Sequence, residues 1–381
     1  MKKDWLHIKF ADAFVLNMGK TPARAEASYW TDGIYPWVSI SDLSGDKFIT
    51  HTKEQISQKA VNETNIHLVP KGTVIMSFKL SIGKTAIAPF DLYTNEAIMA
   101  FEPKPEISVV PDFLYYYLQY YKWSGNRAVM GETINKAVIS NSYADIPPLS
   151  IQRSIVAELD LLHSVISKKK EQLRELDNLA QSLFYQMFGD PITNPMGWEI
   201  KKLGEVAPVK SYQGDIVSEK GLYWLLNLDM VEAQTGKILE KNMLDKDEIG
   251  NSTTSFSPDN VLYSKLRPYL NKVVLPDTCG YCTTELLPLL PQKDILNREY
   301  LCYLLRSKSF VDYINTKVAG AKMPRVTMDD FRNFPIPLPP LSLQQSFAAK
   351  VSAIEAQKQA ITLSIKETEA LLAQRMDTYF S

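Results

Sequence analysis

The chain has 381 residues, of which 45% are hydrophobic and 22% are charged, and its formal net charge at pH 7 is −1. This composition is that of a folded globular protein, it excludes a disordered or low-complexity chain, and the length allows two or three domains. The balanced charge argues against a nucleic-acid binder, although equal totals can hide a basic face.

The N-terminus and the cysteine count indicate the compartment. The first residues, MKKDWLH, lack the apolar run of a secretory signal, and no uncharged apolar stretch approaches the length of a membrane span. Three cysteines without a disulfide pattern fit a reducing environment. We therefore expect a cytoplasmic protein with no membrane association.

The first part of the chain, residues 1–146, is predicted to form a sheet and then a helix. Four short runs of β-type composition are broken by proline, glycine and aspartate. They are Trp37–Ile40, Thr73–Phe78, Thr85–Ala88 and Ala97–Phe101. Pro111 then opens an aromatic-rich stretch that ends at Tyr121, and this stretch favours a helix packed on a curved sheet.

A long amphipathic helix is predicted next. From Ile155 onward, apolar residues recur at alternating spacings of four and three, and Lys169 is the exception. This is a heptad pattern, and the intervening residues are polar. Two prolines at 147 and 148 prevent the helix from extending backward, and Gly189 followed by a proline should end it.

The second half of the chain repeats the first. The octapeptide PPLSIQRS at 147–154 returns as PPLSLQQS at 339–346, with six of eight positions identical. Further segments match in the same order: Trp5–Asp12 with Trp198–Glu205, Tyr35–Leu43 with Tyr223–Met230, Val74–Ser77 with Val261–Ser264, and Phe113–Leu118 with Tyr300–Leu305. Two copies at this separation indicate two globular domains from one duplication.

The second octapeptide also opens a long helix. Ser342, with Gln345 three residues on, is predicted to start it as a capping box. The two heptad patterns are expected to pair antiparallel, because the first helix must return the chain to a second domain. Lys169, Lys358 and Arg375 would then set the register or contact a partner. The predicted fold class is α+β, with two duplicated β-rich domains separated by two long helices that form an antiparallel coiled coil.

Enzyme signatures are absent from the sequence. Gly19-Lys-Thr and Gly83-Lys-Thr resemble the end of a Walker motif, but Phe14 and Phe78 stand where its first glycine is required. The lone pair Cys279 and Cys282, with all four histidines in the first half, argues against a zinc site. We expect no catalytic residue, no bound metal and no cofactor on this chain.

Binding chemistry gathers in polar loops that occupy matching places in the two halves. Arginine and lysine can hydrogen-bond to phosphates or to the edge of a guanine. The hydroxyls of serine and threonine can also bond to phosphates or to bases. The candidate DNA-binding residues are Lys20, Thr21, Arg24, Ser39, Ser41, Lys79, Lys84 and Lys136 in the first half, and Lys265, Arg267, Tyr269, Lys322 and Arg325 in the second. Each loop alone is more often ordinary surface, and their recurrence in both copies is what favours binding.

The chain resembles the specificity (S) subunit of type I restriction–modification systems along essentially its whole length. The segments that carry the resemblance are GKTP, YWTDGIYPWVSISDL, SKLRPYLNKVVL, GAKMPRVTMDDF and the two PPLSxQxS helix starts. It implies target recognition domains at 1–146 and 191–338 and helical spacers at 147–190 and 339–381. Each recognition domain would read one half of a split double-stranded DNA sequence, and the loop differences suggest unlike halves.

The resemblance also implies partners. Methyltransferase subunits, expected to be two, would bind S-adenosylmethionine and modify adenine, and restriction subunits would use ATP and Mg for translocation and cleavage. The specificity subunit itself would be non-catalytic. The rival interpretation is a duplicated coiled-coil scaffold or adaptor with no DNA-binding role, which the neutral charge slightly favours. The target sequence, its spacer length and the division between base and phosphate contacts do not follow from the sequence.

Overall fold

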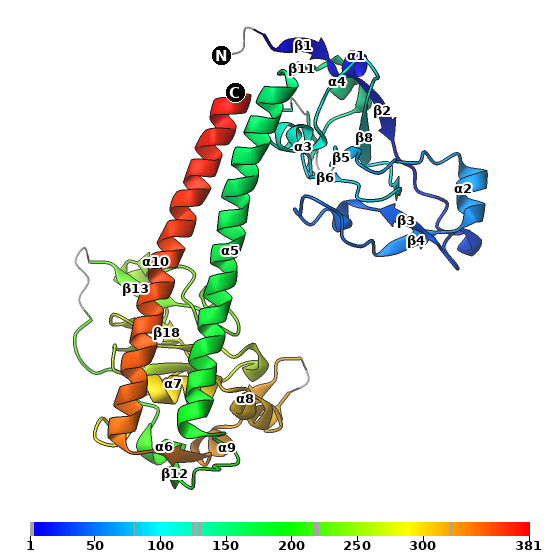
Figure 1. Cartoon of the computed structure of the whole chain (residues 1–381). Helices are drawn as coiled ribbons and strands as arrows, with labels where there is room; N and C mark the ends of the chain where they lie inside the picture. The colour runs from blue at the N-terminus through cyan, green and yellow to red at the C-terminus, as the bar shows by residue number, and fades with distance from the viewer. Residues whose placement is uncertain (1–3, 80, 124–125, 129–130, 217–220, 321) are drawn as a thin grey trace. The chain divides into compact units, whose positions relative to one another are not determined.

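The computed structural model of the chain describes residues 4–381 except 80, 124–125, 129–130, 217–220 and 321 (Figure 1). Its contacts divide the chain into two compact units. Unit 1 consists of Met1–Lys168 and Ile365–Ser381, and unit 2 of Lys169–Ser364. The long helices α5 (Leu149–Phe188) and α10 (Leu341–Phe380), 40 residues each, contribute one half to each unit.

The described residues of the β-rich part of unit 1 form four sheets. Its elements are β1 (Leu6–Lys9), α1 (Phe10–Ala13), β2 (Phe14–Met18), β3 (Tyr35–Val38), β4 (Glu54–Ile56), α2 (Gln58–Thr64), β5 (Val74–Ser77), β6 (Thr85–Ile87), β7 (Tyr93–Thr94), β8 (Ile98–Pro103), α3 (Pro111–Tyr120), β9 (Asn126–Ala128), β10 (Gly131–Thr133), α4 (Lys136–Asn141) and β11 (Tyr143–Ile146). The strand orders are β2-β8-β5-β6, β4-β3-β7, β1-β11 and β10-β9.

The core of unit 1 lies between the four-stranded sheet and α3. Phe10, Phe14 and Phe101 are at most 1% exposed and meet one another at ring distances of 5.8–6.0 Å. Phe113 of α3 continues this cluster and contacts Phe380 near the end of α10. Each such buried ring contributes roughly 1.5–3 kcal/mol, so the end of α10 is anchored to this core.

Unit 2 repeats this plan. Its elements are β12 (Glu199–Lys202), α6 (Leu203–Val206), β13 (Tyr223–Leu226), β14 (Asn242–Leu244), β15 (Thr253–Phe256), β16 (Val261–Ser264), β17 (Val273–Val274), β18 (Gly280–Thr283), β19 (Leu286–Leu289), α7 (Arg298–Arg306), α8 (Lys308–Asn315), β20 (Val318–Ala319), β21 (Arg325–Val326), α9 (Met328–Arg332) and β22 (Pro335–Leu338). The strand orders are β14-β13-β18-β15, β17-β16-β19, β12-β22 and β20-β21.

Matching strand pairings confirm the duplication. β1 pairs antiparallel with β11 as β12 does with β22, and β5 pairs antiparallel with β8 as β16 does with β19. One parallel pairing also recurs, β3 with β7 in unit 1 and β13 with β18 in unit 2. The predicted α+β class with two β-rich copies is therefore confirmed.

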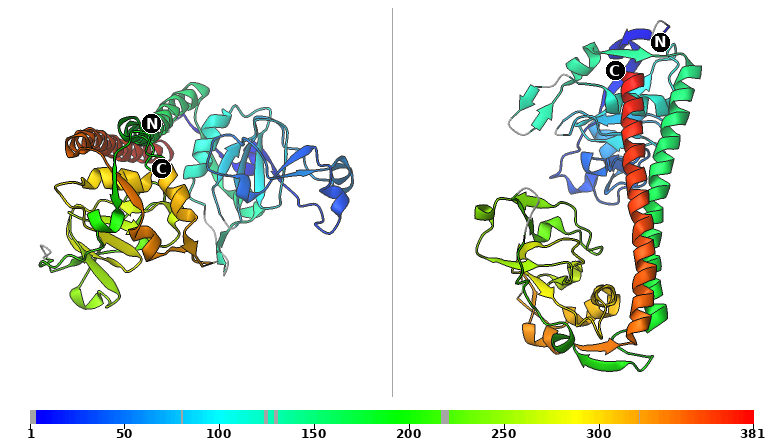
Figure 2. Two further views of the ribbon diagram at one scale, coloured as in Figure 1. Left: turned by 90° about the horizontal axis from the view of Figure 1, so that it is seen from below. Right: turned by 90° about the vertical axis from the view of Figure 1, so that its left-hand side faces the viewer.

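The two long helices run antiparallel in each unit, as predicted. In unit 1 the start of α5 contacts the end of α10, and in unit 2 the end of α5 contacts the start of α10 (Figures 1 and 2). The cations of the heptad pattern meet partners on the opposite helix: Arg375 with Glu158 at 2.8 Å, Lys358 with Asp177 at 2.7 Å, and Lys169 with the Ser364 hydroxyl at 2.6 Å. These pairs are compatible with one register only, because each cation needs its partner opposite.

The glutamine shared by both octapeptides ties each helix start to its unit. Gln152 is fully buried, its Oε1 accepts from the Val110 amide at 2.7 Å, and its Nε2 donates to the Ser108 and Pro147 carbonyls at 2.9 and 2.7 Å. Gln344 makes the same three bonds, with the Asn297 amide at 2.8 Å and the Ile295 and Pro339 carbonyls at 3.0 and 2.8 Å. Val110 and Asn297 are the N-cap residues of α3 and α7, so this side chain fixes a second helix beside the first.

One prediction about a helix start is wrong. α10 begins at Leu341, so Ser342 lies inside the first turn and cannot be its N-cap. The prolines before it set the start instead: the Pro340 carbonyl accepts from the Gln344 amide at 3.2 Å, and a proline keeps the residue that precedes it out of the helical conformation. Gly189, with φ +76°, follows the last residue of α5 as predicted. Among the described residues, no helix combines the length and the apolar character needed to cross a membrane.

Candidate functional site

Two loops of unit 2 meet beside the end of β16, and we call them the unit 2 loop pair (residues 264–271, 318–320 and 322–326). The Arg267 amide donates to the Pro324 carbonyl at 2.7 Å, and the Val326 amide donates to the Lys265 carbonyl at 3.0 Å. Leu266 also forms a β-bridge with Arg325. The structure therefore brings the loop that carries Lys265 and Arg267 beside the loop that carries Lys322 and Arg325, although the two loops are far apart in the sequence.

The backbone of this loop pair is held in an uncommon conformation at Arg267. Its φ is +49°, in the left-handed region that non-glycine residues rarely adopt, and a proline follows it. Such a conformation costs on the order of 1 kcal/mol or more and persists only where neighbours impose it. Here the bond to Pro324 and the Leu270 amide, which donates to the Arg267 carbonyl at 2.9 Å, impose it. The Arg267 side chain stays exposed, as does that of Tyr269.

Arg325 differs from its neighbours because it has an acidic partner. Its Nε and Nη2 donate to Glu285 Oε1 at 3.2 and 3.0 Å. The hydrogen bond to Glu285 raises the pKa of Arg325 above its ordinary value. Within the described part of the chain, Lys265, Arg267 and Lys322 form no ion pair. The unit 2 loop pair thus combines three unpaired cations with one arginine–glutamate pair.

Unit 1 contains the equivalent arrangement, which we call the unit 1 loop pair (residues 77–79, 81–84 and 134–136). The Ile134 amide donates to the Phe78 carbonyl at 3.1 Å, in the place of the Val326–Lys265 bond of unit 2. The Ser77 amide donates to the Lys84 carbonyl at 2.8 Å, and this bond joins the two ends of the first loop. Lys79, Lys84 and Lys136 lie in this loop pair, and none of them has an ion-pair partner among the described residues.

The helix that follows each loop pair begins in the same way. Asn135 is the N-cap of α4, and its side chain accepts from the Val138 amide at 2.9 Å. Thr327 is the N-cap of α9, and its hydroxyl accepts from the Asp330 amide at 3.3 Å. Asparagine and threonine are favoured N-caps because their oxygens satisfy an amide that has no partner in the helix. The same local chemistry therefore fixes one side of the loop pair in both units.

The other candidates of unit 1 bond to the protein itself. The Lys20 Nζ donates to the Thr64 carbonyl at 2.6 Å, and Thr21 donates to Glu96. Arg24 pairs with Glu54 through Nη1 at 2.5 Å and Nη2 at 2.9 Å, and its guanidinium lies 3.8 Å from the centroid of the Trp30 ring. These contacts hold the segment 19–24 against α2, β4 and the turn before β8, and the predicted DNA contacts of these three residues stay predictions.

Ser39 and Ser41 belong to the turn after β3. The Ser39 amide and hydroxyl both donate to Asp42 Oδ2, at 2.8 and 2.7 Å, and the two serine hydroxyls lie 2.8 Å apart. Ser39 is the N-cap of the short 3₁₀ helix Ile40–Asp42, where a serine commonly satisfies an orphan amide. Both hydroxyls thus stabilise the turn, and no observation tests a further role in binding.

Sequence reasoning missed the two glutamates that pair with arginines of the candidate set. Glu54 lies in β4, and Glu285 lies immediately before β19, 40 residues from Arg325. Isolated acidic residues in a sequence usually lie on the solvent-exposed surface without a specific role. No spacing in the sequence indicates that Glu54 pairs with Arg24 or Glu285 with Arg325. Only the strand pairing that brings β19 beside β16 could have located Glu285.

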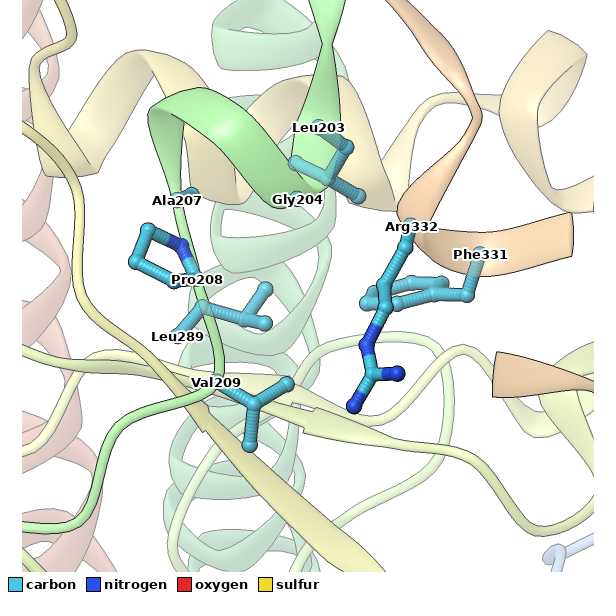
Figure 3. Close-up of a pocket in the computed structure, with 8 residues that line it drawn as sticks. All are labelled: Leu203, Gly204, Ala207, Pro208, Val209, Leu289, Phe331 and Arg332. Atoms are coloured by element: carbon cyan, nitrogen blue, oxygen red, sulfur yellow. The ribbon is translucent and has the colours of Figure 1, made fainter. Parts of the chain in front are cut away.

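Unit 2 also contains a small cavity of about 160 Å³ between α6, β19 and α9 (Figure 3). Its lining residues are Leu203, Gly204, Ala207, Pro208, Val209, Leu289, Phe331 and Arg332. When the two copies are aligned, Leu203 and Ala207 of unit 2 correspond to Phe10 and Phe14 of unit 1. The smaller side chains of unit 2 leave the volume of the cavity unfilled. The lining is apolar apart from Arg332, and it offers no nucleophile or general base.

Comparisons with known proteins place these features in a family. The sequence matches the description "Type I restriction modification DNA specificity domain" twice, at residues 2–178 and 195–368. It is 24% identical to the MjaIX specificity subunit of a type I restriction enzyme of Methanocaldococcus jannaschii, over 97% of this chain and 92% of that protein. It is 21% identical to the EcoDI specificity subunit of Escherichia coli, over 96% of this chain and 85% of that protein.

Two solved structures share the fold. A chain from a study of complex assembly and conformational transition in a type I R-M system aligns with a TM-score of 0.63 at 18% identity, over 99% of this chain and 98% of that chain. The S subunit of a type I restriction–modification system from M. genitalium aligns with a TM-score of 0.54 at 10% identity, over 99% of this chain and 96% of that one. At these identities the likeness establishes the architecture alone.

Proposed function

The chain belongs to the family of type I restriction–modification DNA specificity domains, and from that premise we propose that it is the DNA-recognition subunit of such a complex. It reads a target of two separated halves, one with each unit. The observation that carries this proposal is the recurrence of one loop pair in two units. The loops differ in sequence, so the two halves of the target are unlike.

The unpaired cations supply the affinity. Six of them, three in each unit, form no ion pair with the described residues and can meet phosphates: Lys79, Lys84 and Lys136 in unit 1, and Lys265, Arg267 and Lys322 in unit 2. Each phosphate contact releases counterions and contributes about −0.9 to the slope of log K against log salt, so six contacts give a slope of roughly −5. The near-zero net charge is no obstacle, because many acids pair with other basic residues, as Asp177 does with Lys358.

Catalysis belongs to partners in this proposal. Methyltransferase subunits, two per chain, bind S-adenosylmethionine and modify adenine in the target, and restriction subunits with ATP and Mg cut the DNA. The chain itself is non-catalytic and binds none of these cofactors. Recognition domains at 1–146 and 191–338, with helical spacers at 147–190 and 339–381, complete the proposal. None of the relatives named above is described as a scaffold without a DNA-binding role.

A binding selection tests the proposal. The full chain, assembled with its methyltransferase subunits, is incubated with duplex DNA that carries a randomised core, and the bound fraction is sequenced. We expect two short fixed sequences separated by a constant gap. A bound fraction with no sequence preference would contradict the proposal. The isolated chain should transfer no methyl group from S-adenosylmethionine, and detectable transfer would contradict the non-catalytic assignment.

A further inference from the structure

Two arginines of the candidate set each hold a glutamate, but with different edges of the guanidinium group. Arg24 uses its end edge, since Nη1 and Nη2 donate to the two carboxylate oxygens of Glu54. Arg325 uses its side edge, since Nε and Nη2 donate to Glu285. A guanidinium has five N–H donors in one plane, so the edge taken by the carboxylate decides which donors remain.

The end edge of Arg325 remains available. Nη1 and the second hydrogen of Nη2 point away from Glu285, and they bond to no other group in the described part of the chain. Two parallel N–H donors on an end edge match the O6 and N7 acceptors of guanine in the major groove. The Arg325 side chain is 44% exposed, so a base edge can reach it.

The charge around Arg325 favours a base over a phosphate. The Glu285 carboxylate, 25% exposed, neutralises the arginine and would repel a phosphate placed beside it. A guanine edge carries no net charge, so it gains two hydrogen bonds without that repulsion. The neighbouring cations Lys265, Arg267 and Lys322 have no acidic partner in the described residues, and they suit phosphates.

Both members of the pair are fixed by the backbone. Arg325 lies in β21, paired with Ala319 and bridged to Leu266. Glu285 lies in the turn between β18 and β19, and its carbonyl accepts from the Lys265 amide at 3.0 Å. A side chain that discriminates between bases must be held within a fraction of an ångström, which a paired strand and a carboxylate that accepts from two N–H groups together provide.

We propose that Arg325 reads a guanine in the half of the target bound by unit 2, and that Glu285 is the residue that positions it for this contact. The inference rests on the proposed function and adds a specificity-determining pair to it. Arg24 has the opposite role. Its end edge is occupied by Glu54 and its face lies over Trp30, so it acts as a structural clamp in unit 1.

Three variants of the full chain, assembled with the methyltransferase subunits, test this assignment on the randomised duplex pool. Arg325→Lys keeps the charge but loses the bidentate fork. Glu285→Gln keeps the shape of the side chain but removes its negative charge and replaces one acceptor oxygen with an NH₂ donor, which cannot pair with the guanidinium. Glu54→Gln is the matched control, because it breaks the other arginine–glutamate pair. Thermal unfolding of each variant verifies that it is folded.

The expected result is confined to one base pair. A bidentate arginine–guanine contact is worth about 1–3 kcal/mol, so Arg325→Lys should reduce discrimination at one G·C position by roughly 5- to 150-fold. Glu285→Gln should relax the same position, and the double variant should lose no more than Arg325→Lys alone, because the glutamate acts through the arginine. Glu54→Gln lies in unit 1 and should leave the base preferences in the half bound by unit 2 unchanged.

Several results would overturn the assignment. If Glu285→Gln tightens binding to all sequences alike, the carboxylate only repels phosphates. If Arg325→Lys weakens all sequences alike, or relaxes a position that is not G·C, the arginine does not read guanine. In each of these cases the parent still selects a split target, so the proposed function stands. A parent with no sequence preference would refute both.

Discussion

Replacing Gln344 with leucine should selectively loosen unit 2. The side chain is fully buried, and its three hydrogen bonds join the Asn297 amide, the Ile295 carbonyl and the Pro339 carbonyl. Leucine has nearly the same volume, so the change removes the bonds without opening a large cavity. An unsatisfied buried group costs about 1–3 kcal/mol, and three of them with partial relaxation give a loss of about 2–5 kcal/mol.

Hydrogen exchange followed by mass spectrometry is the suitable assay, because a chain with two units does not unfold in one step. Amides at the start of α7 and α10 should exchange faster by roughly 30-fold or more. A 30-fold change corresponds to a free-energy loss of about 2 kcal/mol, the lower end of the expected range. Segments of unit 1 should keep their protection. Gln152→Leu should produce the reciprocal pattern, with the loss confined to the start of α3 and α5.

Gln345→Leu is the matched control, since it changes the same residue type one position along. Gln345 is exposed, and its side chain forms no hydrogen bond with the described residues, so its replacement should change stability by no more than about 0.5 kcal/mol. Equal exchange rates for Gln344→Leu and Gln345→Leu would refute the claim that the repeated glutamine fixes each helix start.

Three further predictions concern titration, reactivity and salt. Burial lowers the pKa of Lys358, but its hydrogen bonds to Asp177 and a neighbouring glutamate raise it more, so the net pKa lies above the ordinary 10.5. The stabilisation is therefore complete below pH 10.5 and is lost as the pH rises through the folded pKa. The urea midpoint of the transition that unfolds unit 2, which contains Lys358, should fall more steeply above pH 10.5 for the parent than for Lys358→Met, and parallel curves would contradict this. Burial raises the pKa of Cys282 to about 12, so at pH 8 this thiol is almost entirely protonated. Iodoacetamide at pH 8 should therefore label Cys279 much faster than Cys282 in the native protein, and equal rates would show that the buried thiol is accessible. Lys322→Ala should weaken binding to all sequences alike and reduce the salt slope by about 0.9, and an unchanged slope would remove that lysine from the phosphate contacts.

The helices and the duplication could be predicted because they depend on local patterns. A heptad spacing of apolar residues from Ile155 onward needs only one face of a helix to be buried, and Gly189 supplies the positive φ that ends it. The short strands also emerged from their composition and from the turns between them. The error at Ser342 arose because a capping pattern was given priority over the preceding prolines, which set the helix start two residues earlier than an N-cap at Ser342 would.

The candidate site could be predicted only in part. The loops were identified by their composition and by their recurrence, but the approach of Lys265 to Val326 depends on a backbone bond between residues far apart in the sequence. The partner of each arginine depends on strand order, which no local pattern specifies. Arg24 and Arg325 look alike in the sequence, and the structure separates them by the edge that each glutamate occupies.

The most direct test of the account is the methylation pattern of genomic DNA, read by long-read sequencing in cells with and without this gene. The account predicts an adenine-methylated motif of two unlike halves with a fixed gap, which disappears when the gene is deleted and returns when it is restored. A methylation pattern that does not change on deletion in cells that express the methyltransferase subunits would contradict the claim that this chain selects the DNA target.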